Sequence, residues 1–228
     1  MNTVSPPERK RLTLARRTAF TLTALTLLAA VPVSHAALFD FQAWIAANGE
    51  QGFVNSSPFA LTDAGLTLTA TAFEAGGADS HVYLDDEYNN IIGGMGVCTA
   101  LNAGDQCTPS SDDNVSNGEV LSWGFSQDIT QLVLELGDDS HFDFNNRDFE
   151  YSLDNGTSWA TATTNGNAMV TLLLAGGGGQ VDFRAADTAV EDQFYIRKAD
   201  ITVIPVPAAV WLFGSGLLGL AGVVRRHT

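Results

Sequence analysis

The sequence predicts an all-β domain, an antiparallel β-sandwich of jelly-roll-like arrangement, between two short terminal segments of different character. Three observations support this fold class. Apolar and polar residues alternate with a period of two through most of residues 66–203, as expected of strands with one buried face. Threonines and aromatic residues are concentrated in these runs, and Gly, Asn and Asp separate them. The middle of the chain, about 165 residues, has the length of a single domain.

The elements of the domain follow from local patterns. In residues 40–48, apolar side chains recur at helical spacing, Asp40 is suited to cap a helix and Gly49 to end it, although an edge strand would fit the same residues. Four glycines, 176–179, fall between two strand patterns and predict a loose hairpin loop. The alternating pattern predicts strands at 66–73, 81–84, 119–125, 131–136, 149–153, 168–174, 180–184 and 193–203.

The N-terminal segment has the three parts of a secretory signal peptide. Residues 1–17 are rich in Arg and Lys, residues 19–31 are apolar, and Ser34-His35-Ala36 is a small-residue exit. We therefore predict that residues 1–36 form a signal peptide that is cleaved between Ala36 and Ala37. The domain that follows, residues 37–203, is expected to be exported.

The C-terminal segment, residues 204–228, predicts a transmembrane helix. An uncharged apolar run of 17 residues, 208–224, would extend about 25 Å as a helix, against roughly 30 Å of hydrocarbon. This is the short limit for a span, and it becomes workable when flanking arginines reach up to the head groups. A Pro-x-Pro sequence precedes the run and a basic pair follows it: Pro205, Val206, Pro207, Arg225 and Arg226. The positive-inside rule places both basic ends of the chain in the cytoplasm and the domain on the periplasmic side.

This order of parts, the proline signature, the run that begins Trp211-Leu-Phe-Gly-Ser-Gly and the final arginines, resembles the PEP-CTERM sorting signal of Gram-negative bacteria. It departs from that signal at Val206, which stands where the family carries glutamate. The resemblance implies recognition by an exosortase, cleavage near Pro205–Pro207 and release towards the cell surface. A plain single-span membrane anchor is the alternative interpretation. The stretch from Ile91 to Leu121, together with Phe149–Asp154, also resembles ectodomains of other PEP-CTERM proteins, which implies an envelope or matrix protein but no chemistry.

Charge is divided unevenly along the chain. The whole sequence has a net charge of −15, but residues 37–204 contain 25 acidic residues and four basic ones, a net charge of −21. A domain this acidic repels nucleic acid and anionic membrane, so neither is expected as a partner of its surface. It should attract cations and gain stability from salt.

Cys98 and Cys107 are the two cysteines of the chain. In an exported protein such a pair predicts a structural disulfide. A metal site would need further ligands, and no histidine lies between the two cysteines. A redox-active pair would have closer spacing.

Two further patterns have both a structural and a functional interpretation. The sequence Ser152-Leu-Asp-Asn-Gly-Thr-Ser-Trp159 matches the Asp-box pattern, which predicts a tight hairpin with the tryptophan packed beneath it, and alternatively an exposed ring for sugar stacking. Acidic clusters follow several predicted strands, and calcium binds six to eight oxygens from such loops. Solvated turn residues are the simpler interpretation. The first candidates for calcium ligands are Asp85, Asp86, Asp112 and Asp113.

Support for catalysis is thin. His81 and His141 are the histidines of the domain, and neither stands in a Ser/His/Asp or metal-ligand pattern. No nucleophile elbow, phosphate-binding loop or dinucleotide motif occurs. We therefore predict a non-enzymatic structural or adhesive protein of the cell surface or extracellular matrix, for example of a biofilm. Its expected partners are the translocon, exosortase and the membrane. The alternative is a module that binds exopolysaccharide, with calcium as a possible cofactor.

Overall fold

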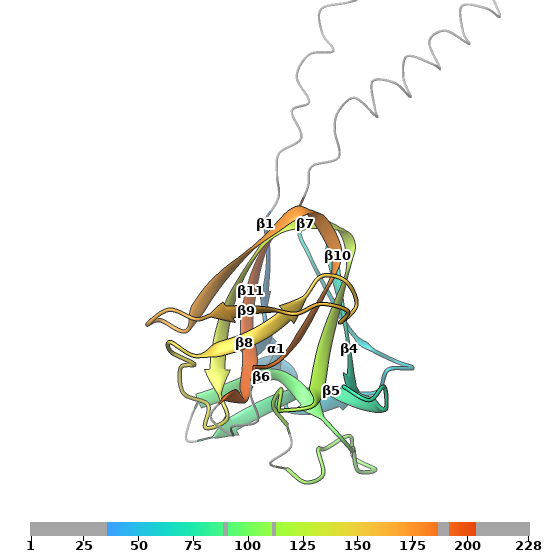
Figure 1. The fold of residues 1–228 in the computed structure, drawn as a ribbon. Helices are drawn as coiled ribbons and strands as arrows, with labels where there is room; N and C mark the ends of the chain where they lie inside the picture. Colours follow the sequence, from blue (N-terminus) through green and yellow to red (C-terminus); the bar gives the residue numbers. More distant parts are fainter. Residues whose placement is uncertain (1–35, 89–90, 111–112, 187–191, 204–228) are drawn as a thin grey trace, which may run out of the picture. The chain divides into compact units, whose positions relative to one another are not determined.

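The computed structural model describes residues 36–88, 91–110, 113–186 and 192–203, and over these ranges the chain consists of antiparallel strands and one short helix (Figure 1). The prediction of an all-β antiparallel fold is confirmed. The elements in chain order are β1 (Ala36–Asp40), α1 (Phe41–Asn48), β2 (Gln51–Phe53), β3 (Phe59–Asp63), β4 (Leu66–Glu74), β5 (Asp79–Tyr88), β6 (Ile91–Cys98), β7 (Glu119–Asp138), β8 (Asp148–Ser152), β9 (Ala160–Thr163), β10 (Met169–Ala185) and β11 (Phe194–Val203).

The strands form one sheet that closes on itself. Around this circuit β7 pairs with β4, β4 with β5, β5 with β6, β6 with β11, and β11 again with β7. β10 lies on the other side of β7 and continues to β8 and β9, while β1 extends the sheet beyond β11. The inward faces of these strands meet in a single apolar core.

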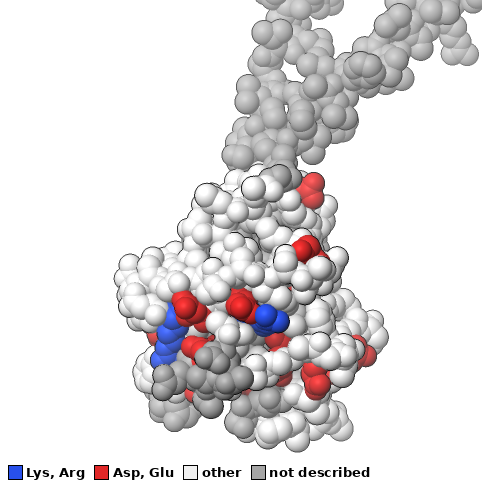
Figure 2. Space-filling model, viewed as in Figure 1, with Lys and Arg blue, Asp and Glu red and all other residues white. Residues whose placement is uncertain are grey.

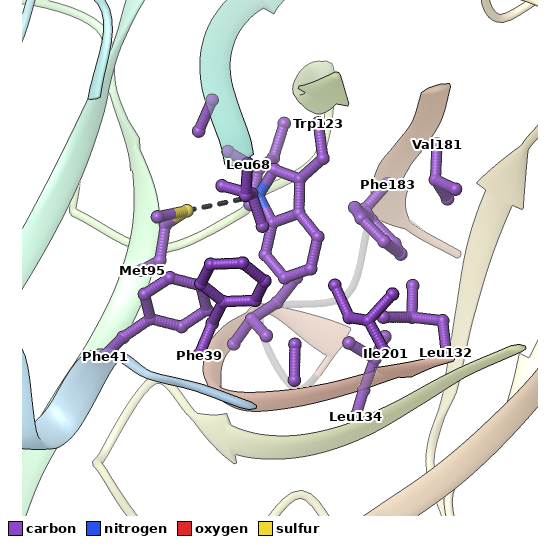
Figure 3. Close-up of a cluster of buried hydrophobic side chains, with 14 of the residues drawn as sticks. Phe39, Phe41, Leu68, Met95, Trp123, Leu132, Leu134, Val181, Phe183 and Ile201 are labelled. Carbon is purple, nitrogen blue, oxygen red and sulfur yellow. Dashed lines mark hydrogen bonds between the residues drawn. The ribbon is translucent and has the colours of Figure 1, made fainter. Parts of the chain in front are cut away.

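The core is centred on Trp123 of β7 (Figure 3). Its ring lies 5.5 Å from that of Phe41 and 5.0 Å from that of Phe183, centroid to centroid, and its Nε1–H points at Sδ of Met95 at 3.2 Å. The alternation of residues 119–125 directs one row of side chains into this core, with Leu121 and Trp123 fully buried and Phe125 partly buried. Helix α1 buries Phe41 and Ile45 against this core, and Oδ1 of Asp40 accepts a hydrogen bond from the Ala43 N–H at 2.8 Å, as expected of an N-cap.

The prediction of a hairpin loop at glycines 176–179 is wrong. β10 runs without a break from Met169 to Ala185 and pairs along its length with β7, which is also one strand where the sequence predicts two. The register shifts between Leu173 and Gly178 and again between Gly178 and Gln180. The glycines therefore occupy a bend that both strands share, and Gly177 adopts a φ of 79° there, which a residue without a Cβ does at no steric cost.

The two ends of the described domain lie side by side. β1 and β11 are antiparallel neighbours, with Ala36 opposite Thr202 and Asp40 opposite Lys198. β1 is at the edge of the sheet, where the Leu38 N–H donates to Oδ2 of Asp63 at 2.8 Å. A carboxylate at this position discourages the edge from pairing with another chain. The chain thus enters and leaves the domain at one end.

No helix within the described ranges is long and apolar enough to cross a membrane. The predicted span, residues 208–224, and the predicted signal peptide lie outside the described residues, apart from Ala36.

Candidate functional site

Within the described ranges, a cluster of ionisable side chains lies on the outer side of β5, β6 and β11. Strand alternation in β5 directs Val82 and Leu84 into the core and places Asp85 on the opposite face, where it is buried, only 7% exposed. The other members of this buried polar network come from β11, from the loop after β7 and from the segment before β7: Tyr195, Arg197, His141 and Asp113. Two loops far apart in sequence are therefore joined to the sheet by polar contacts.

His141 is held by an acceptor at each ring nitrogen. Its Nδ1 lies 2.9 Å from the Ile91 carbonyl oxygen and its Nε2 lies 2.6 Å from Oδ2 of Asp85. Because both partners are acceptors, the imidazolium form satisfies the site. Burial lowers the pKa of His141, but the contact with Asp85 and the Ile91 carbonyl outweigh burial, and the net shift is upward. With both nitrogens engaged, the ring serves as a link between loop and strand.

Arg197 links the same loop to β11. Its guanidinium donates to the carbonyl oxygens of His141 and Phe142, at 2.5 and 3.0 Å, and to Oδ1 of Asp143 at 2.8 Å. The side chain is only 5% exposed. Gly137 makes room for it, because a Cβ there would lie 2.6 Å from Nε of Arg197. A buried arginine thus satisfies backbone groups that the loop could not pair itself.

Asp113 and Tyr195 complete the network. The Tyr195 hydroxyl donates to Oδ1 of Asp113, and its ring meets that of His141 edge-on, with centroids 5.1 Å apart. Burial and the negative charge of Asp85 raise the pKa of Asp113 to about 6, and burial together with Asp85 and Asp113 raises the pKa of Tyr195. The network therefore concentrates negative charge that His141 offsets.

This network predicts a domain that is more stable in weak acid. Asp113 and His141 both bind protons more tightly in the folded chain than in the unfolded chain, so the folded state holds more protons between pH 5 and 8, and stability falls as pH rises. Stability from Asp113 is lost as pH rises through about 6. Because Asp113 is partly exposed, we expect a loss of about 1–2 kcal/mol in unfolding free energy from pH 5 to 8.

Urea unfolding at pH 5, 6, 7 and 8 measures this dependence. Asp113→Asn should flatten the curve through pH 6, since the variant lacks that titrating group. Stability that rises over this range in the unsubstituted protein would contradict the assignment. Asp154 does not titrate between pH 5 and 8 and so does not affect this measurement. Hydrogen bonds from the side chain of Ser158, and then from its backbone, lower the pKa of Asp154 to about 2.

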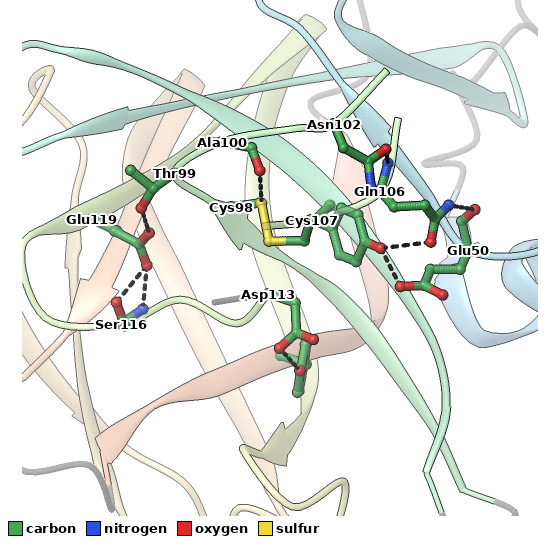
Figure 4. Close-up of a disulfide and its surroundings, with 12 residues drawn as sticks. Glu50, Cys98, Thr99, Ala100, Asn102, Gln106, Cys107, Asp113, Ser116 and Glu119 are labelled. Carbon is green, nitrogen blue, oxygen red and sulfur yellow. Dashed lines mark hydrogen bonds between the residues drawn. A yellow bond between two sulfur atoms is a disulfide. The ribbon is translucent and has the colours of Figure 1, made fainter. Parts of the chain in front are cut away.

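The predicted disulfide is confirmed. Cys98 and Cys107 are joined, with a Cα–Cα distance of 5.8 Å (Figure 4). Both are buried beside Tyr83 and Leu101. The loop that the disulfide closes is docked on β2. The Gly52 N–H donates to the Asp105 carbonyl at 2.8 Å, and a Cβ on Gly52 would lie 2.3 Å from the Leu101 side chain.

Tyr83 fixes the far side of this loop. Its hydroxyl donates to the Glu50 carboxylate and lies 3.3 Å from Oε1 of Gln106, and Nε2 of Gln106 donates to the Glu50 carbonyl at 3.2 Å (Figure 4). Burial, and then the hydrogen bond to Glu50, raise the pKa of Tyr83. The loop is therefore held by the disulfide and by the hydrogen bonds among Tyr83, Glu50 and Gln106.

Replacing Cys98 and Cys107 together with Ala should lower the unfolding free energy by about 2.5–3 kcal/mol, the entropic contribution of closing so short a loop in the unfolded chain. Urea unfolding under non-reducing conditions measures the loss. Addition of a reductant should leave the double variant unchanged and bring the unsubstituted protein, once unfolded, to the same midpoint. A double variant within about 0.5 kcal/mol of the unsubstituted protein would contradict this role.

The calcium candidates separate in the structure. Asp85 belongs to the network and contacts His141, the side chain of Asp86 is exposed, and Asp112 lies outside the described residues. The negative charge of Asp85 helps to raise the pKa of Asp113, so the two carboxyl groups lie near each other. Oδ1 of Asp113, however, already accepts a hydrogen bond from the Tyr195 hydroxyl. Within the described ranges, no group of three or more His, Cys, Asp or Glu side chains is arranged to hold a metal ion. Calcium binding stays a prediction.

The Asp-box segment forms the predicted hairpin, between β8 and β9. Asp154 accepts from the Ser158 N–H at 2.8 Å, and Gly156 has a φ of 70°. Trp159 packs back on the turn, with its Nε1–H donating to the Gly156 carbonyl at 3.0 Å. The guanidinium of Arg184 lies over the same ring, 4.1 Å from its centroid, so a sugar that stacks on this face must displace Arg184.

Sequence reasoning missed the two network residues on β11. A tyrosine and an arginine in an alternating strand do not reveal that they are buried, because the loops that cover them come from distant segments. A signal was present in β6, where Gly93, Gly94 and Gly96 occur within a strand. Glycines in a strand interior often mark close approach of another chain segment.

The processing sites can be placed only in part. The predicted cleavage bond between Ala36 and Ala37 lies within β1, and Ala37 is 1% exposed and paired with Ile201. Cleavage there must therefore precede the docking of β1. The predicted sorting residues lie outside the described residues: Pro205, Val206, Pro207, Arg225 and Arg226.

No protein-family model and no curated protein matches the chain. Among solved structures, one similar chain has 14% sequence identity and a TM-score of 0.32, and the match covers 77% of this chain and 99% of the other. That structure is described by the words "The complexity of the Ruminococcus flavefaciens cellulosome reflects an expansion in glycan recognition". A similarity at this TM-score identifies neither the fold family nor the function of this chain.

Proposed function

We propose that this chain is an exported, non-enzymatic protein of the cell surface or extracellular matrix, whose C-terminal tail is recognised and cut by an exosortase. The observation that supports export is the disulfide between Cys98 and Cys107, which is buried and closes a loop docked on the sheet. Such bonds form and persist in oxidising compartments outside the cytoplasm. The sorting step rests on the resemblance of residues 204–228 to the PEP-CTERM signal.

The internal contacts of the domain support a structural role. His141 and Arg197 use their polar groups to join loops to the sheet, which leaves them engaged within the protein. The net charge of −21 over residues 37–204 keeps such a domain soluble outside the cell and gives it affinity for cations. We infer that the folded domain serves as a rigid acidic unit of a matrix.

Expression of the tagged full chain, with and without an exosortase, tests the proposal through intact masses from membrane and medium. We expect a released species that ends near Pro205–Pro207 only when exosortase is present, and added mass on that end would identify an attached group. Replacing Pro205 and Pro207 together with Ala should keep the protein in the membrane, whereas Val206→Ala is the matched control and should be processed. If the chain stays uncut in both hosts, the tail is a plain membrane anchor and not a sorting signal.

The alternative function, binding of exopolysaccharide with help from calcium, has less support because Arg184 covers a face of Trp159. Retardation in gels that contain envelope polysaccharides would separate the two functions. If Arg184→Ala strengthens the retardation and Trp159→Ala abolishes it, the result favours a polysaccharide-binding module. Superimposable melting curves with calcium and with a chelator would exclude the calcium contribution.

A further inference from the structure

The end of the domain at which the chain enters and leaves carries an exposed apolar side chain. Leu173 of β10 is 74% exposed, the largest value among the exposed large apolar side chains of the described ranges. Strand register places it in one row with Gln131, Thr202 and Ala36. This row crosses four strands at the level where β1 begins and β11 ends.

Two more exposed apolar residues share the outer face of these four strands. Leu172 and Leu174 point into the core, so Leu173 points outward, and the same alternation places Met169 and Leu38 on the outer face. The three are spread over this face, because Met169 lies four residues before Leu173 on β10 and Leu38 lies on β1, two strands beyond β7. In the view of Figure 2, the end of the domain at which β1 begins and β11 ends shows few charged side chains, with acidic residues at its side.

The sequence after β11 limits how far this end can lie from a membrane. The predicted span begins at Ala208, five residues after Val203, and five Cα–Cα steps cover at most about 18 Å. The head-group layer occupies roughly 5–8 Å of that length. This step rests on the proposed function, in which the uncut tail spans the bilayer. The end that carries Leu173 is then confined to within roughly 10–13 Å of the lipid surface.

We propose that, while the tail is uncut, this end of the domain rests on the lipid head groups and inserts Leu173 among them. The partner is the lipid surface. The acidic domain is repelled by anionic lipid, and Asp63 and Asp128 lie near this end, so the short tether and the apolar side chain maintain the contact. Once the tail is cut, the same repulsion drives the domain away from the membrane, which assists release.

Nitroxide labels on the full chain, reconstituted with its tail intact in vesicles of phosphatidylethanolamine and phosphatidylglycerol, test the contact. The native cysteines are joined and buried, so a thiol introduced by Leu173→Cys is the one that reacts. The readout is the ratio of collisions with oxygen, which is lipid-soluble, to collisions with an aqueous nickel chelate. Phe142→Cys is the matched control, because Phe142 is also exposed, at 55%, and follows the C-terminal end of β7, whereas Leu173 pairs with Gln131 in the middle of that strand.

We expect the ratio at residue 173 to exceed that at residue 142 by roughly threefold or more, with Thr171→Cys in between. Equal ratios at 173 and 142 would overturn the inference. The label is itself apolar and could insert in place of Leu173. A second variant therefore carries the label at residue 171, through Thr171→Cys, together with Leu173→Glu. This substitution should lower the ratio at 171, and an unchanged ratio would show that Leu173 does not insert.

Flotation of the same vesicles separates this inference from the function on which it rests. A chain that floats but shows equal ratios overturns only the contact of Leu173 with lipid. A chain that does not float overturns the membrane anchor and the contact together. The domain without its tail should remain in solution, and its binding to the vesicles would overturn the role of the tether in release.

Discussion

Replacing Arg197 with Met is expected to lower the unfolding free energy by about 2–4 kcal/mol. The methionine fills a similar volume but leaves the carbonyl oxygens of His141 and Phe142 without their donors in a buried site. Asp143 adds less to the loss, because its side chain is 61% exposed and water can solvate it. The effect should also loosen the loop after β7, which Arg197 ties to β11.

Lys198→Met is the matched control. Lys198 is the next residue on the same strand, but its side chain is 37% exposed and its nearest carboxylate oxygens lie 3.6 and 3.8 Å away. Exposed pairs of this kind contribute little, so we expect a change within about 0.5 kcal/mol. Urea unfolding of both variants provides the comparison. Equal losses would show that the buried contacts of Arg197 carry no special weight.

Gly96→Ala should lower the unfolding free energy by about 3 kcal/mol or more, because the added methyl group meets backbone atoms that no side-chain rotation can move. A Cβ at Gly96 would lie 2.2 Å from the Asp113 carbonyl oxygen and 2.7 Å from Cα of Asn114. The segment before β7 would have to lift from β6. Asp113 would then lose its place beside Tyr195, and the pH dependence of stability should flatten in the same variant.

Gly124→Ala controls for the general effect of alanine in a strand. Gly124 lies within β7, and the nearest atom to an added Cβ is the Thr69 carbonyl oxygen at 3.9 Å, an ordinary contact. We expect this variant to change stability by at most about 0.5–1 kcal/mol in either direction. Thermal and urea unfolding of both glycine variants provide the measurement. A Gly96→Ala protein as stable as Gly124→Ala would exclude the close approach of the segment to β6.

The sequence predicts some elements well because the signals that define them are local. Alternation in residues 119–125 and 131–136 identifies the inward rows around Trp123 and Leu134, and Asp40 and Gly49 mark the ends of the helix. The glycine run at 176–179 misleads for the same reason. Four glycines permit a chain reversal and a shared bend equally, and only the partner strand decides between them.

The sequence by itself determined the antiparallel all-β class, the direction in which most strand side chains point, and the pairing of the two cysteines. These follow from periodicity and composition, which act between near neighbours. Its predictions of a leader and a sorting tail are also local, and they fall almost entirely outside the described residues.

Only the tertiary structure decided which faces are covered on their outer side and what covers them. His141 meets Asp85 across 56 positions, and Arg197 meets the His141 carbonyl across another 56. The glycines of β6 acquire their role from a segment that returns to the sheet later in the chain. Alternation shows that one face of a strand is buried, but contacts between distant segments determine whether the other face meets water or a charged partner.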